Sequence, residues 1–140
     1  MSIAAILAPV FVLVLLTFGL MVWMGMARGG ALKRGETRIA DVALGQPNWP
    51  PKVQQISNNY ISQFQVPVLF YVLVALAMIT RHADFVFVIM SWLFVLMRLV
   101  HSYIHTTSNY VRHRFNAFLV GCLILLAMWL AGLGLLAEFL

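Results

Sequence analysis

The sequence predicts an all-α integral membrane protein, a bundle of four transmembrane helices. Of its 140 residues, 63% are hydrophobic and only 9% are charged, whereas charged residues make up about 25% of a typical soluble domain. The apolar residues also gather in long runs between short polar connections. A soluble fold of this length could not bury so much apolar surface, which excludes a soluble enzyme. We expect one membrane domain over residues 1–140.

The first helix is expected over residues 3–27, which carry no charged side chain. This run is long enough to cross the hydrocarbon core of a bilayer. A signal peptide would place basic residues before the run, but here Arg28, Lys33 and Arg34 follow it, so we expect a retained helix. Residues 28–51 contain glycines, prolines and most of the charge, and they are expected to form the one long loop.

Three further helices are expected in the rest of the chain. The second covers residues 52–80, with a polar first half and an apolar second half. The third covers residues 84–112, where Asp84 is a suitable N-cap. The fourth covers residues 115–138 and has no charged side chain before Glu138.

The basic residues predict how the chain crosses the membrane. The first connection has five Lys and Arg residues, the third has two, and the second has one. Because basic loops stay in the cytoplasm, we expect loops one and three there and both termini on the other side. The short chain without a targeting segment suggests a bacterial inner membrane, with the termini in the periplasm, although an endoplasmic reticulum protein would have a similar pattern. The net charge of +5 lies beside apolar runs, so the expected partner is membrane lipid and not nucleic acid. Cys122 is the only cysteine, which excludes an internal disulfide.

The third predicted helix carries a polar face inside an apolar span. At 100° per residue, the polar side chains share one face about 80° wide. Arg98 falls near the middle of the membrane, where a charge is costly, so it should face the protein interior. The members of this face are Arg98, His101, His105, Asn109 and Arg112.

A matching row on the second predicted helix consists of Gln55, Asn59 and Gln63, spaced four residues apart. Folding the chain into a hairpin at residue 82 places Gln63 level with His101, and Gln55 level with Asn109. We therefore expect a continuous polar cleft that opens to the cytoplasm beside Arg112 and ends near Arg98. None of the four acidic residues is expected at that depth, so an anionic ligand is the natural counter-ion for the arginine.

The pair His101 and His105 also invites a metal-site interpretation, because histidines four residues apart lie on one helix face. Zinc would need two further ligands, and no cysteine or acidic residue is expected at this depth. We therefore predict no metal site.

Two motifs resemble the MAPEG family, the membrane-associated proteins in eicosanoid and glutathione metabolism. The pattern R-x-x-H-x-x-x-H-x-x-x-x-x-x-R, from Arg98 to Arg112, is similar to the arginine and tyrosine or histidine spacing of the family's third helix. The pattern N-x-x-x-Q-x-x-x-P-V-L-F, from Asn59 to Phe70, resembles the family's asparagine–glutamate–proline signature.

The resemblance implies a homotrimer that binds glutathione between subunits near the cytoplasmic surface. It implies a glutathione-dependent transferase or peroxidase acting on a small hydrophobic electrophile. Arg112 corresponds to the arginine thought to stabilise the glutathione thiolate, a role that suits a fixed cation. The residues expected to line the glutathione pocket are Asn59, Gln63, Arg98, His101, His105, Gln55 and Asn109.

A second function stays open at this point. Gln55 stands where the family usually has an arginine, and Gln63 lies next to the place of its usual glutamate. These departures favour a non-catalytic bundle that uses the cleft for a lipid, a quinone-like molecule or a larger membrane complex.

Overall fold

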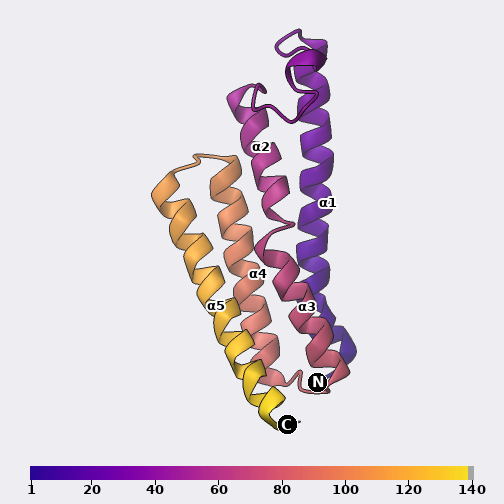
Figure 1. The fold of residues 1–140 in the computed structure, drawn as a ribbon, viewed down its shortest axis with the longest axis vertical. Helices are drawn as coiled ribbons and strands as arrows, with labels where there is room; N and C mark the ends of the chain where they lie inside the picture. Colours follow the sequence, from indigo (N-terminus) through magenta and orange to yellow (C-terminus); the bar gives the residue numbers. More distant parts are fainter. Residues whose placement is uncertain (139–140) are drawn as a thin grey trace.

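The computed structural model describes residues 1–138 and shows a bundle of long helices (Figure 1). Four helical stretches are long and apolar enough to cross a membrane, which confirms the predicted all-α membrane architecture. The elements are α1 (Ile3–Lys33), the short 3₁₀ helix η1 (Ile39–Asp41), α2 (Pro51–Ser62), α3 (Val66–Ile79), α4 (Phe85–Thr106) and α5 (Val111–Glu138).

The two ends of the bundle differ in charge. Both termini and the α3–α4 turn lie at one end, whereas the long first loop and the α4–α5 connection lie toward the other (Figure 1). Five Lys and Arg residues lie in the last turns of α1, the loop after it and the first turn of α2, and two lie in the first turn of α5. We call this second end the basic end.

The first helix is longer than predicted, because α1 continues past residue 27 to Lys33. The extra turns pack against α2. The Arg28 Nε donates a hydrogen bond to the Ser57 hydroxyl over 3.1 Å, and Ala31 is completely buried. These contacts keep a segment that contains Gly29 and Gly30 helical, although glycine lowers helix propensity.

The predicted second helix over residues 52–80 is broken into α2 and α3. Pro67 lies in the first turn of α3 and has no N–H to donate to the preceding turn. The chain crosses the break through short i to i+3 hydrogen bonds: the N–H of Gln63 donates to Tyr60, and that of Phe64 to Ile61. The break therefore lies where proline removes the helical bond.

The prediction that the third helix reaches Arg112 was wrong, because α4 ends at Thr106. Asn109 adopts a left-handed backbone with φ of 51°, which asparagine tolerates better than most residues. Its N–H closes the helix end by donating to the Ile104 carbonyl over 2.7 Å. The next helix, α5, then begins at Val111 and not at residue 115. Asn109 thus belongs to the connection, and Arg112 belongs to α5.

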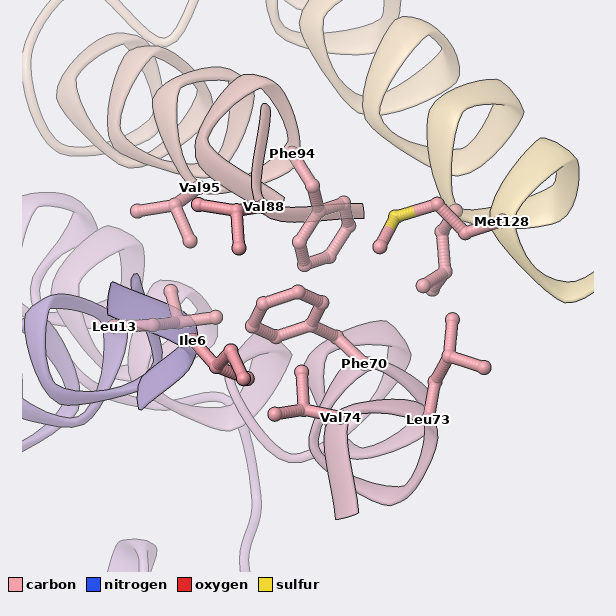
Figure 2. Packing of buried hydrophobic residues seen from close by; sticks show 10 residues of the cluster. Ile6, Leu13, Phe70, Leu73, Val74, Val88, Phe94, Val95 and Met128 are labelled. Atoms are coloured by element: carbon pink, nitrogen blue, oxygen red, sulfur yellow. The ribbon is translucent and has the colours of Figure 1, made fainter. Parts of the chain in front are cut away.

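The apolar core fills the half of the bundle nearer the termini. Phe70 of α3 and Phe94 of α4 are completely buried, with ring centroids 4.9 Å apart (Figure 2). Leu13 of α1 and Met128 of α5 close the cluster from the other two sides. Nearer the basic end, the buried side chains of α4 are polar instead of apolar.

Candidate functional site

A buried polar stripe joins α2, the α2–α3 break and α4. We define this polar stripe as Asn59, Ser62, Gln63, Arg98 and Ser102. Four of these side chains are at most 4% exposed, and Ser62 is partly exposed. Buried polar groups need hydrogen-bond partners, so their contacts decide whether the stripe is structural or open to a ligand.

Arg98 faces the interior, as its depth requires, and is only 3% exposed. Its Nη2 donates to the Ser62 hydroxyl over 3.0 Å and to the Ser62 carbonyl over 3.4 Å. The guanidinium thus supplies a donor to the backbone at the break between α2 and α3.

The charge of Arg98 has no carboxylate counter-ion within residues 1–138. Glu36 pairs with Arg34, and Asp41 pairs with Arg38, both in the first loop. The other two acidic residues, Asp84 and Glu138, lie at the end opposite the basic end. Within residues 1–138, the Arg98 Nε also lacks a hydrogen-bond partner. Neutral groups therefore accept only some of the hydrogen bonds that Arg98 can donate, and no carboxylate balances its charge.

Asn59 is the centre of the polar stripe and has no exposed surface. Its Oδ1 accepts a hydrogen bond from the Ser102 hydroxyl over 3.2 Å, and its Nδ2 donates to the Ser102 carbonyl over 3.5 Å. Gln63 Nε2 donates to the same hydroxyl over 3.3 Å. These bonds cross-link α2 with α4.

The prediction of an open polar cleft is therefore wrong for the polar stripe. Gln63 is 1% exposed, and its amide bonds to groups of the stripe itself, including the Asn59 carbonyl over 3.1 Å. The stripe is packed against itself because each amide finds a partner on the facing helix. Asn59, Gln63 and Arg98 meet as the spacing predicted, but the partner of both amides on α4 is Ser102 and not a histidine. The network is buried, although Gln63 Oε1 lacks a partner within it.

Nearer the basic end, α2 pairs with α4 one helical turn earlier than expected. Gln55 Nε2 donates to the carbonyl of His105 over 3.4 Å, whereas Asn109 was its expected neighbour. The Lys52 ammonium donates to the carbonyl of Thr106. The early end of α4 explains this shift, because its last carbonyls lie free for side chains of α2.

His101 and His105 are buried next to each other, with ring centroids 5.4 Å apart. His101 also packs against Phe118 of α5, at 6.0 Å between ring centroids. Within residues 1–138, no group of three or more His, Cys, Asp or Glu side chains lies close enough to hold a metal ion. His101 thus takes part in the packing between α4 and α5, and His105 packs beside it on α4.

Arg112 lies apart from the polar stripe. It is exposed in the first turn of α5 and lines an open hollow of about 660 Å³ at the α4–α5 connection. Asn109 lines the same hollow, and its Oδ1 accepts a hydrogen bond from Arg114. The placement of Arg112 on the same helix face as Arg98 was wrong, because it assumed one continuous helix through Asn109.

Sequence reasoning missed the serines that complete the network. Ser102 lies four residues after Arg98 on the same helix face, a spacing that could have identified it. Ser57 is completely buried and accepts the hydrogen bond from Arg28. Sequence reasoning also missed two cation–π pairs at the basic end, in which Arg28 lies 5.1 Å from the Trp49 ring and Lys52 5.6 Å from the Trp23 ring.

The basic end carries an exposed cation at the start of α5, Arg112. Within the described residues, Arg112 forms no ion pair, and it lies where the free N–H groups of a helix N-terminus add positive potential. A cation at such a place favours a nearby thiolate or carboxylate.

The comparison with known families covers nearly the whole chain. The family model described as the MAPEG family matches residues 6–134. Neither the curated proteins nor the solved structures give a significant match. The chain belongs to the MAPEG family.

Proposed function

We propose that the protein is a glutathione-dependent membrane enzyme, a transferase or peroxidase that acts on a hydrophobic electrophile. The observation that carries this proposal is the place of Arg112, exposed in the hollow at the α4–α5 connection. Membership of the MAPEG family is compatible with this activity.

The chemistry assigned to Arg112 is stabilisation of the glutathione thiolate. A cation and a helix N-terminus both lower the pKa of a thiol, so more of it is the nucleophilic thiolate at neutral pH. In a transfer reaction the thiolate sulfur forms a bond to the electrophilic carbon, and the leaving group departs with the bonding electrons. The electrophile would reach the hollow from the bilayer.

The glutathione carboxylates would find further cations at the same end. Lys52 contacts the carbonyl of Thr106, the last residue of α4, and Arg114 contacts Asn109 in the connection. Both basic side chains are therefore held close to the hollow that Arg112 lines. An arginine can bind a carboxylate through two parallel hydrogen bonds, whereas lysine acts as a point charge.

A homotrimer is part of this proposal. Asn58 and Gln65 are exposed on the outer side of the span that includes α2 and α3, and Gln54 donates to Asn58 Oδ1 over 2.8 Å. Lipid tails offer such amides no partner, so a neighbouring subunit is their best cover. We also propose that the basic end faces the cytoplasm, following the distribution of Lys and Arg, and that both termini face the periplasm if the membrane is a bacterial inner membrane.

The test is a conjugation and peroxidase assay on the purified protein, with glutathione and either an aryl halide or a lipid hydroperoxide. Arg112→Ala should lower kcat by about 10²-fold, the scale for removing one charge-stabilising group from an active site. Lys33→Ala is the matched control, because Lys33 is exposed at the same end but does not line the hollow. Equal loss in both variants, or none in Arg112→Ala, would contradict the proposal.

One observation favours a non-catalytic alternative. Asn59, Gln63 and Arg98, which were expected to line the pocket, direct their hydrogen bonds to partners within the polar stripe. A bundle stabilised in this way could bind a lipid, a quinone-like molecule or a larger membrane complex without any turnover. A protein that shows no thermal shift at millimolar glutathione, and no turnover, fits this alternative.

A further inference from the structure

A second hollow lies at the end of the bundle opposite the basic end, between α3, α4 and α5. We call it the terminal groove. It has a volume of about 560 Å³, within the range of about 300–1,000 Å³ that is usual for small-molecule sites. Its walls are mainly apolar and include Leu76, Phe87, Met90 and Leu136.

Small residues keep the terminal groove open. Ala77 of α3 and Ala127, Ala131 and Gly132 of α5 all line it. A Cβ added to Gly132 would lie 3.9 Å from Leu73 Cδ1, an ordinary contact. One methyl group would therefore fit at this position, but a large side chain would fill the groove.

The length of the terminal groove matches one leaflet of a bilayer. Its lining on α5 runs from Ala127 to Leu136, a rise of about 14 Å at 1.5 Å per residue. Half of a hydrocarbon core is about 15 Å thick. The lining hydroxyl and ionisable side chains, Thr80, His82 and Asp84, belong to the α3–α4 turn region. The groove thus runs from a polar mouth into the apolar layer.

The mouth of the groove carries both signs of charge. Glu138 Oε2 lies 3.9 Å from His82 Nε2, and Asp84 lines the mouth while its Oδ1 caps α4 through the Phe87 N–H at 2.8 Å. Arg81 does not line the groove, but it is exposed and lies in the chain between Thr80 and His82, which do. A headgroup with an ammonium and a phosphate complements this arrangement.

We propose that the terminal groove holds an acyl chain of an aminophospholipid from the leaflet at this end. In a bilayer the groove is no more apolar than the surrounding lipid tails, so chain burial alone gives little preference. Selectivity therefore comes from the mouth, where Asp84, and Glu138 beside His82, attract the ammonium, and the neighbouring exposed Arg81 is within the chain turn that the phosphate would meet. This site is separate from the hollow assigned to glutathione.

The experiment measures lipid bound to the full-length protein in detergent, by mass spectrometry after delipidation and addition of phosphatidylethanolamine or phosphatidylglycerol. Wild type should prefer phosphatidylethanolamine by about fivefold, the scale of one headgroup charge contact of about 1 kcal/mol. Gly132→Phe should lose this binding, and Gly134→Phe should keep it. Gly134 is the matched control because it lies on the same helix but does not line the groove. A Cβ added to Gly134 would have no other atom within 4 Å.

Two further variants test the headgroup contacts. Asp84→Asn combined with Glu138→Gln should abolish the preference, and asparagine still caps α4. If Gly132→Phe does not fold, quenching of Trp129 by a brominated acyl chain replaces it, because Trp129 lines the groove. The wild-type protein should then show stronger quenching by phosphatidylethanolamine than by phosphatidylglycerol, and Trp129→Phe should remove the difference. Equal binding of both lipids by wild type, or unchanged binding by Gly132→Phe, would overturn the proposal.

Discussion

The change Asn59→Leu tests whether the polar stripe holds α2 against α4. Asn59 is completely buried and shares hydrogen bonds with Ser62, Gln63 and Ser102. Leucine has a similar size but can make none of these bonds. The substitution therefore removes polar contacts with little change in packing volume.

The expected loss of stability follows from which bonds cross between helices. Two bonds join Asn59 to Ser102 of α4, one to its hydroxyl and one to its carbonyl. The hydroxyl of Ser62 and the amide of Gln63 keep the Asn59 carbonyl as a partner, at 2.6 and 3.1 Å. At about 0.6 kcal/mol for an average bond in a membrane protein, the two crossing bonds contribute about 1.2 kcal/mol.

The assay is a double-mutant cycle of Asn59→Leu with Ser102→Ala, with the free energy of unfolding measured in mixed micelles. The two changes should couple by about 0.6 kcal/mol, because both remove the bond between Asn59 Oδ1 and the Ser102 hydroxyl, whereas the bond to the Ser102 carbonyl is lost only with Asn59. Ser91→Ala is the control, since Ser91 is another buried serine of α4 that bonds only to the Phe87 carbonyl. A coupling below about 0.3 kcal/mol between Asn59 and Ser102 would refute the role of the stripe as a cross-link.

Three further predictions concern single residues outside the polar stripe. Arg81→Gly should raise the free energy of unfolding by about 0.5–1 kcal/mol in thermal melts, because Arg81 has a φ of 58° that glycine adopts without strain. Arg34→Ala should raise the pKa of Glu36 toward 4.5 in an NMR titration, because the hydrogen bond from Arg34 holds this pKa below its usual value. In wild type the stabilisation from this pair is present above pH 4.5 and is lost as the pH falls through the lowered pKa of Glu36. Ser57→Ala should lower the free energy of unfolding by about 0.6 kcal/mol, because Arg28 Nε loses its acceptor; an unchanged melting curve would contradict this.

The sequence was sufficient to predict the four spans and the approach of Asn59, Gln63 and Arg98 to one another. Long apolar runs mark membrane helices because the hydrocarbon core demands them. The cost of a charge at mid-depth is equally general, so the inward direction of Arg98 followed from its position alone. Asn59 and Gln63 could be placed against α4 because the short turn at residue 82 forces an antiparallel pair.

The helix breaks were not predicted, and they changed the candidate site. Apolar pattern alone does not reveal that the chain crosses the region before Pro67 with i to i+3 bonds. The run Thr106-Thr107-Ser108-Asn109 was the available signal for the end of α4, because these side chains compete for backbone hydrogen bonds. Once Asn109 takes a left-handed backbone, Arg112 can no longer share a helix face with Arg98.

The most direct test of the proposed function is the ultraviolet absorbance of the glutathione thiolate during binding to the purified protein. We predict a thiolate signal at neutral pH for wild type and for Lys33→Ala, and a much smaller signal for Arg112→Gln. The absence of a thiolate signal from wild type at saturating glutathione would contradict the account.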